Sequence, residues 1–368
     1  MNPLRVGQHW PVDPVELRDA LGGIVQRGFY ANNGPLVRGL DGEFGGRHGA
    51  AGAVAFGSAA LATMCAARAL SLDGVVLAPI TAPLALLQGL AWGGASVALL
   101  DVAPEGENID PALLESWDGP VAGVAVTRSS TEPELSPALL ALATARGASV
   151  LVDATHALGC RVRGDAVGSE GPVHIFGFSD SEIVGAGEGG IVVAQSPVIL
   201  DRLRDARSFH ASYAETPVRP RINGKMGEGA AALIRLGLRH LEARIEANRA
   251  GLAAWEARLA GIPGLRLRGG QPGSSAAACW VVLPEHGPES GEVAATLAAE
   301  GLATGRVPDA QQQRLRLGRA AEAGASLSSP HADRQRMRWL RLPHGPHVDA
   351  AVRDRYADTL GIMLRGGR

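Results

Sequence analysis

The residues best suited to chemistry lie in one stretch, residues 151–193, where polar side chains follow short apolar runs. The first run, Leu151–Asp153, ends in a carboxylate, and His156 comes three residues later. The second run, Val173–Phe178, is followed by Glu182 after a short polar turn. Because open α/β sheets bind ligands beyond the carboxyl ends of their strands, we expect these side chains to line one crevice.

Two acids and an imidazole in one crevice are suited to moving protons. Carboxylates and histidines act as general acids and bases when their surroundings bring the pKa towards the working pH. Two neighbouring carboxylates repel, so one of Asp153 and Glu182 is expected to have a raised pKa. The structural alternative is that Asp153 only caps a following helix and that His156 only packs.

A second site candidate comes earlier, where Gly57–Leu61 follows an apolar run and precedes an Ala-rich helical stretch. The first amides of a helix and its positive dipole end are suited to an anion such as phosphate. Ser58 and Ala59 would supply the hydroxyl and an amide. A serine at this place can also serve only as the N-cap of the helix.

The 35 Lys and Arg residues include a single lysine, Lys225. The guanidinium of arginine stays protonated and does not form a Schiff base. Lys225 is therefore the only side chain that could form an imine with an aldehyde cofactor.

The segment 176–190, FGFSDSEIVGAGEGG, resembles the FSFHxxKxxxxGEGG signature of the DegT/StrS family of sugar aminotransferases. Gly57–Leu61, Arg221–Glu228 and Arg338–Pro343 resemble other motifs of that family, so the resemblance covers nearly the whole chain. It implies the α/β fold of type I pyridoxal phosphate (PLP) enzymes. A large domain with a mainly parallel sheet would be followed by a small C-terminal α/β domain.

The resemblance also assigns roles to particular residues. Asp153 matches the acid that pairs with the pyridine nitrogen of PLP, and Ser58 with Ala59 matches the site of its phosphate. Asn223 matches an asparagine that reaches the phosphate bound by the other subunit of a dimer, so a homodimer is expected. His156 stands where the family has a glutamine that contacts the cofactor.

Four positions depart from the family pattern. Glu182 occupies the position of the Schiff-base lysine, and a carboxylate cannot form an imine. Gly177 replaces a phosphate-binding serine, Ala82 replaces an aromatic that stacks on the cofactor, and His156 replaces the glutamine. We therefore expect either no cofactor or weakly bound PLP or its amine form, pyridoxamine phosphate (PMP).

Three functions are compatible with these departures. The first is a repurposed, cofactor-independent enzyme of sugar, amino-sugar or natural-product biosynthesis, with Glu182, His156 and Asp153 as catalytic residues. The second is a dehydratase-type enzyme that holds PLP or PMP without a covalent link. The third is a non-catalytic protein, or a dimer partner of an intact aminotransferase. The expected ligand is a small molecule such as a nucleotide sugar.

The elements that would position these residues alternate between apolar strands and helices, as in a parallel sheet covered on both faces. We predict a large domain over residues 1–245 and a small domain over 246–368. Helices are expected at 14–27, 36–48, 228–260, 290–300 and 348–364, and strands at 276–283, 301–306 and 338–343. Residues 311–332 are polar and are expected to form a loop.

Composition excludes several other classes of protein. A net charge of −2 offers no basic surface for nucleic acid or for a membrane. No apolar stretch reaches the length of a membrane span, and the N-terminus does not resemble a signal peptide. Three scattered cysteines indicate neither a disulfide framework nor a metal site. We expect a cytoplasmic protein.

Overall fold

The structure is a computed structural model that describes residues 5–209, 215, 217–318 and 328–365. A seven-stranded sheet forms the centre of the larger part, in the order β1-β9-β8-β5-β4-β2-β3. All of its strands run parallel except β9, which is antiparallel to both of its neighbours. The strands are β1 (Gly52–Phe56), β2 (Val75–Pro79), β3 (Ser96–Leu100), β4 (Gly123–Ser129), β5 (Ser149–His156), β8 (Val173–Gly177) and β9 (Gly190–Ala194).

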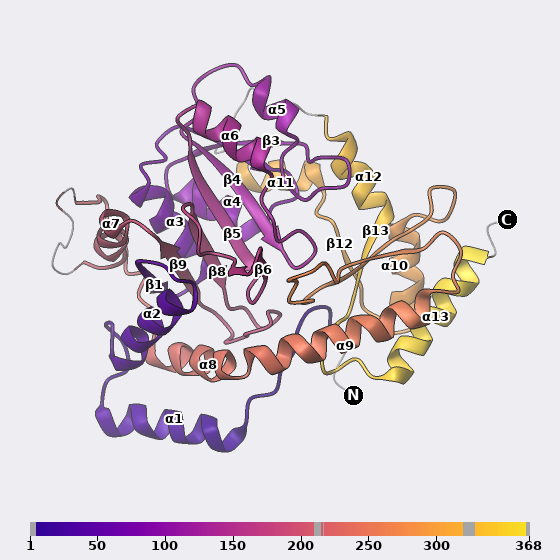
Figure 1. Cartoon of the computed structure of the whole chain (residues 1–368), viewed down its shortest axis with the longest axis horizontal. Helices are drawn as coiled ribbons and strands as arrows, with labels where there is room; N and C mark the ends of the chain where they lie inside the picture. Colours follow the sequence, from indigo (N-terminus) through magenta and orange to yellow (C-terminus); the bar gives the residue numbers. More distant parts are fainter. Residues whose placement is uncertain (1–4, 210–214, 216, 319–327, 366–368) are drawn as a thin grey trace.

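Helices cover both faces of this sheet, and each face has its own apolar cluster (Figure 1). One cluster joins the strands to α2 (Pro35–Arg47), α5 (Pro111–Glu115), α6 (Pro137–Ala145) and α8 (Glu228–Arg239). The other joins them to α3 (Ala59–Ala69), α4 (Leu84–Trp92), α7 (Pro197–Arg207) and α11 (Ala310–Leu317). The N-terminal helix α1 (Pro14–Arg27) packs on α8. The predicted mainly parallel sheet with helices on both faces is confirmed.

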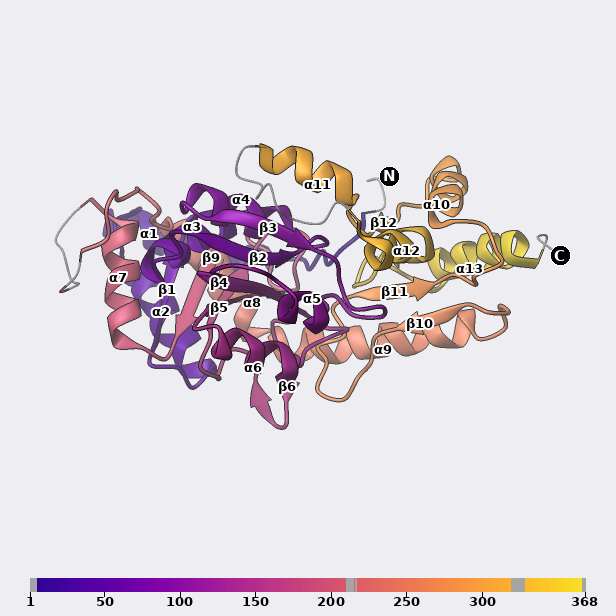
Figure 2. The same ribbon diagram turned by 90° about the horizontal axis from the view of Figure 1, so that it is seen from above.

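A second, antiparallel sheet of four strands lies at the other end of the molecule, in the order β10-β11-β13-β12 (Figure 2). Its strands are β10 (Arg266–Arg268), β11 (Cys279–Val282), β12 (Gly305–Arg306) and β13 (Trp339–Leu342). A separate apolar cluster packs the sheet against α9 (Leu241–Leu259), α10 (Ser290–Ala299) and α13 (Ala350–Arg365). The remaining elements are the ribbon β6 (Arg161–Val162) and β7 (Asp165–Ala166), and the helix α12 (Pro330–Arg338).

Short polar side chains set the starts of several helices. The hydroxyls of Ser58, Ser136 and Ser196 each accept a hydrogen bond from the amide three residues later, at 3.2, 3.3 and 3.4 Å. Such N-caps satisfy amides that have no partner inside the helix.

Two predicted elements differ from the structure. The single helix expected over 228–260 is interrupted at His240, whose φ of −99° and ψ of 4° separate α8 from α9. The side-chain pattern continues through this residue, so periodicity did not reveal the break. The loop expected at 311–332 contains α11 and most of α12, while residues 319–327 lie outside the described residues.

Tertiary contacts explain the helix α11, whose sequence is almost entirely polar. The Asp309 side chain caps it, and the buried Gln313 amide donates to the carbonyl of Ala82 at 2.8 Å. Gln88 of α4 donates to the carbonyl of Arg316 at 2.8 Å. The helix is therefore held by these hydrogen bonds together with Ala310 and Leu317, which belong to the apolar cluster on that face of the large sheet.

The helix α9 runs from the large sheet to the small one (Figure 1). The boundary predicted between residues 245 and 246 falls inside this continuous helix. The division into two domains at that point remains a prediction. None of the helices within the described ranges combines the length and apolar character needed to cross a membrane.

Candidate active site

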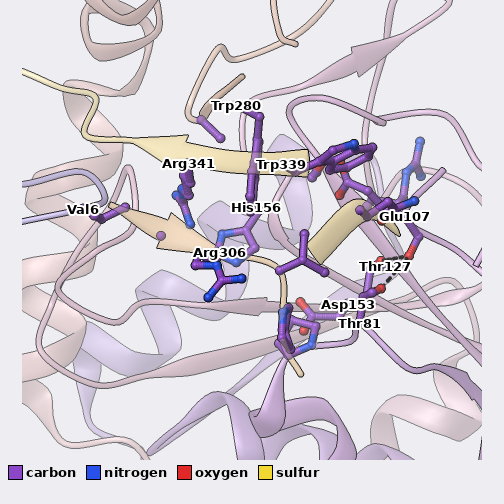
Figure 3. Close-up of a pocket in the computed structure, with 18 residues that line it drawn as sticks. Val6, Thr81, Glu107, Thr127, Asp153, His156, Trp280, Arg306, Trp339 and Arg341 are labelled. Atoms are coloured by element: carbon purple, nitrogen blue, oxygen red, sulfur yellow. Dashed lines mark hydrogen bonds between the residues drawn. The ribbon is translucent and has the colours of Figure 1, made fainter. Parts of the chain in front are cut away.

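Two cavities of about 420 and 400 Å³ meet at the carboxyl ends of the parallel strands and share Pro83, Asp153 and His156. The first cavity lies between this edge and the small sheet (Figure 3). The second lies over the first turn of α3. Its walls also include Ser58, Ala59, Thr155, Gly177, Ser179, Glu182, Glu188 and Gly189.

Asp153 lies near the end of β5, where its side chain is almost fully buried. Its Oδ1 accepts a hydrogen bond from the Thr155 amide at 2.9 Å. The Thr155 hydroxyl in turn accepts from the Gly177 amide at 2.9 Å, which ties β5 to β8. Burial raises the pKa of Asp153 more than the hydrogen bonds from Thr155 lower it. The net effect is a pKa above the ordinary value for an aspartate.

His156 and Glu182 form a hydrogen-bonded pair in the wall of the second cavity. The distance between His156 Nδ1 and Glu182 Oε2 is 3.1 Å, and the hydroxyl of Ser179 donates to Glu182 Oε1 at 3.2 Å. The Glu182 side chain is 8% exposed, whereas the His156 side chain is 36% exposed. The carboxylate is thus enclosed, and the imidazole presents an open edge to both cavities.

The pair favours an ionised state. The negative charge of Glu182 raises the pKa of His156 despite its burial. Burial pushes the pKa of Glu182 upwards, but His156, Arg341 and Ser179 together outweigh it, so the pKa falls below its ordinary value. The two surroundings therefore favour the imidazolium form of His156 and the carboxylate form of Glu182.

The structure brings Asp153, His156 and Glu182 to one place, as the sequence predicted. The acid with the raised pKa is Asp153, and the main cause is burial, with repulsion from Glu182 a smaller contribution. The pKa of Glu182 is lowered instead, because the neighbouring imidazole of His156 favours the ionised carboxylate. Repulsion between the two acids alone does not include this effect. The catalytic roles of these residues remain predictions.

The predicted phosphate-binding residues, Ser58 and Ala59, line the second cavity at the start of α3. Asn223 is exposed and is not among the described residues that line either cavity. Its predicted contact with a second subunit therefore remains a prediction. Lys225 pairs through its backbone with Phe56 of β1, and it too is outside both sets of described lining residues.

Sequence reasoning missed the wall that the small sheet contributes. Trp280, Arg306, Trp339 and Arg341 line the first cavity from β11, β12 and β13 (Figure 3). The strand containing Trp339 and Arg341 was predicted, and period-two alternation places these two residues on one face. Which face meets the large sheet was not visible in the sequence.

Both the sequence and the fold of this chain are similar to those of known proteins. The model of the DegT/DnrJ/EryC1/StrS aminotransferase family matches residues 13–360. The chain belongs to this family. A curated member, dTDP-3-amino-3,4,6-trideoxy-alpha-D-glucose transaminase from Streptomyces venezuelae, is 27% identical over 334 residues, which cover 89% of this chain and 86% of that protein.

The chain has the fold of PLP-dependent aminotransferases of fold type I, as its similarity to solved structures shows. DesI, crystallised in the presence of its TDP-sugar product, is 28% identical with a TM-score of 0.91, and the match covers 100% of this chain and 94% of that one. A GDP-4-keto-6-deoxymannose-3-dehydratase, ColD, superimposes with a TM-score of 0.83 at 16% identity, over 98% of this chain and 100% of that one. At that identity the likeness concerns the fold alone.

The side chains of this family member do not fit a covalently held PLP. No lysine occurs among the described residues lining the two cavities. The assignment of Glu182 to the position of the family's lysine remains a prediction from the sequence. A Cβ built on Gly177 would lie 3.1 Å from the Ala59 Cβ, which leaves little room for a phosphate-binding serine. Ala82 is fully buried and presents no aromatic face.

Among the described residues that line the second cavity, Glu182 adds a carboxylate to Asp153 and Glu188, two acids that the family pattern also contains. His156 is the only basic side chain among these described lining residues. The first turn of α3 and the buried Asp153 are the features of a PLP site that persist. We therefore derive no catalytic step through PLP.

Proposed function

We propose that this chain is a cofactor-independent enzyme that moves protons next to a carbonyl group of a sugar, most simply a keto sugar carried on a nucleotide. The observation that supports this proposal is the hydrogen bond of 3.1 Å between His156 and Glu182. It joins two side chains that are suited to acid–base chemistry, and we expect Glu182 to stand where the family signature has its lysine.

The substrate class follows from the relatives. The Streptomyces venezuelae relative is named as a transaminase of a dTDP-linked amino sugar, and DesI was crystallised with a TDP-sugar. Transamination that forms such an amine starts from a carbonyl on the sugar ring. A relative that keeps the sugar cavity without an imine-forming amine could still catalyse enolisation at that carbonyl.

His156 is the proposed proton donor to the carbonyl oxygen. Its Nδ1 is held by Glu182, which leaves Nε2 as the nitrogen available to the substrate. As the imidazolium gives up its proton, the Glu182 carboxylate keeps the ring oriented and stabilises its charged form between turnovers.

Asp153 is the proposed partner that takes the proton from the neighbouring carbon. It lines both cavities together with His156, and burial raises its pKa. A carboxylate with a raised pKa is a stronger base in its ionised form. Return of a proton to the same carbon from the opposite face, while the enol O–H proton goes back to His156, completes an epimerisation with no net oxidation.

Exchange of the hydrogen next to the carbonyl with solvent tests this function, because every product that forms through enolisation requires removal of that hydrogen. Wild-type protein is incubated in D₂O with a panel of dTDP-, UDP- and GDP-linked 4-keto-6-deoxy sugars, and NMR follows deuterium incorporation next to the carbonyl. Glu182→Gln keeps the shape but removes the ionisation, so exchange should fall about 100-fold or more. The surface variant Glu242→Gln should exchange like the wild type.

A cofactor arm separates this proposal from the alternatives. After addition of PLP and borohydride, mass spectrometry should find no pyridoxyl adduct, whereas an adduct on Lys225 would support an aminotransferase. Because Asp153 and the first turn of α3 persist, a dehydratase-type enzyme is the second candidate. Turnover that requires added PMP would favour it. A protein in which Glu182→Gln alters only stability, and in which the wild type shows no exchange, would be non-catalytic.

A further inference from the structure

Arg341 is a partly buried cation that lines the first cavity. Among the described residues its guanidinium makes neither a hydrogen bond nor an ion pair. Glu182 and Glu107 are near enough for their charges to act on it. A partly buried guanidinium without a hydrogen-bond or ion-pair partner among the described residues can bind an anion without first breaking an existing pair, so Arg341 is a candidate for contact with a ligand.

The small sheet builds the position of this side chain. Arg341 on β13 lies opposite Trp280 of β11 and Gly305 of β12. A Cβ on Gly305 would lie 3.1 Å from the Arg341 Cβ and 3.6 Å from its Cδ, so the arginine stem crosses the strand where a side chain is missing. Val6 comes within 3.4 Å of the same point and covers it from the N-terminal segment.

The other arginines of the cavity are already engaged. Arg306 donates from Nε to the Ser290 hydroxyl at 3.0 Å and from a terminal nitrogen to the Arg336 carbonyl at 3.4 Å. Arg128 pairs with Glu170 and donates to the Pro133 carbonyl at 2.5 Å. Among the described lining residues, Arg341 is thus the guanidinium that remains available, and Figure 3 shows it entering from β13 near His156.

We propose that Arg341 binds an oxyanion of the substrate, a carboxylate or a phosphoryl group, and so holds the adjoining carbons against His156. The inference rests on the proposed function and adds a chemical requirement to it: the substrate is anionic close to its reacting centre. The planar guanidinium matches both oxyanions through paired hydrogen bonds. The positive charge of Arg341 acts on His156 and on Glu182, so the bound anion would lie beside the acid–base pair.

Trp280 supplies the neighbouring apolar wall. It shares the strand register of Arg341 and lines the same cavity. A flat aromatic surface beside a guanidinium suits a sugar ring, whose C–H face packs on the indole while its charged substituent reaches the arginine. A site of this kind should bind a sugar that carries an anionic group and should not bind a neutral sugar.

Calorimetric titration of the full chain tests the inference with defined probes. D-glucuronate presents a carboxylate on a sugar, α-D-glucose 1-phosphate and thymidine diphosphate present phosphoryl groups, and D-glucose is the neutral control. We expect the wild type to bind at least one of the anionic probes and not D-glucose. Arg341→Gln should weaken that binding about 10-fold to 100-fold, and Arg341→Lys should weaken it less.

Arg266→Gln is the matched control, because it removes the same charge from the small sheet at an exposed position outside the described lining of the cavity. Its affinity should stay within about twofold of the wild type, as expected for a screened surface charge. Circular dichroism verifies that each variant is folded. Preference for glucuronate would identify a carboxylate site, and preference for the phosphates a phosphoryl site.

The inference is overturned if no anionic probe binds, or if Arg341→Gln and Arg266→Gln bind alike. Failure of the proposed function has a different signature. In that case Glu182→Gln retains wild-type hydrogen exchange, or the wild type has none, while the anionic probes still depend on Arg341. A third outcome would refute only the anion site. In that case hydrogen exchange requires Glu182, but Arg341→Gln leaves the affinity for the anionic probes unchanged.

Discussion

The charged pair of His156 and Glu182 should leave a characteristic dependence of stability on pH. The raised pKa of His156 stabilises the fold below its ordinary value of 6.5, and this contribution is lost as pH rises through the raised value. The lowered pKa of Glu182 stabilises the fold above its ordinary value of 4.5, and this contribution is lost as pH falls through the lowered value. The pair is therefore most stabilising between about 4.5 and 6.5.

We expect Glu182→Gln to lower the free energy of unfolding by about 1–3 kcal/mol at pH 6, towards the lower end because the imidazole is partly exposed. Urea unfolding at pH values from about 4 to 10 would measure the difference between variant and wild type across the window in which both groups titrate. The difference should shrink at alkaline pH, where His156 loses its charge. A difference that stays constant over the whole range would contradict an ionised pair.

Restoring a lysine tests whether residue 182 alone prevents cofactor binding. We expect Glu182→Lys to retain PLP only weakly, because Ala82 offers no stacking face and Gly177 no hydroxyl. Retained PLP is measured by absorbance after dialysis, with the wild type as the control. Stoichiometric retention by the single variant would show that the other departures from the family pattern matter little.

At the scale of the element, the helix α3 depends on its serine cap. Ser58 Oγ accepts the Leu61 amide at 3.2 Å, so removing the hydroxyl leaves that amide without its partner. Ser58→Ala should lower the free energy of unfolding by about 1 kcal/mol, and Ser58→Asn should largely preserve it. Chemical denaturation of the three proteins gives the comparison. Equal losses in both variants would mean that the hydroxyl acts through something other than the cap.

At the scale of the whole molecule, we expect a homodimer. The family motif that contains Asn223 would serve a neighbouring subunit, and Asn223 is exposed in the single chain. Val15, Leu21 and Val25 of α1 are large apolar side chains that are also exposed, at 52%, 44% and 64%. Sedimentation at micromolar concentration should give twice the mass of the 37.9 kDa chain. A strictly monomeric mass would contradict the prediction.

The amino-acid sequence determined the order of the elements and the residues at the ends of the strands. Local rules suffice for these features: apolar runs mark β5 and β8, and small polar residues mark the start of α3. The same rules drew attention to Asp153 and His156 near the end of β5, whereas Glu182 was singled out by the resemblance to the family signature. They also predicted α1 with the bounds that the structure shows.

The pKa values of these residues depend on contacts between distant parts of the chain, which the tertiary structure brings together. The pKa of Glu182 depends on the distance to His156, 26 residues away in the chain, and on the charge of Arg341, which comes from the other sheet. The helix α11 forms where its Gln313 side chain donates to the Ala82 carbonyl just before α4, and where Gln88 of α4 donates to the Arg316 carbonyl. Burial, charge and hydrogen bonding all depend on separation in space, and the spacing of residues along the chain does not contain that separation.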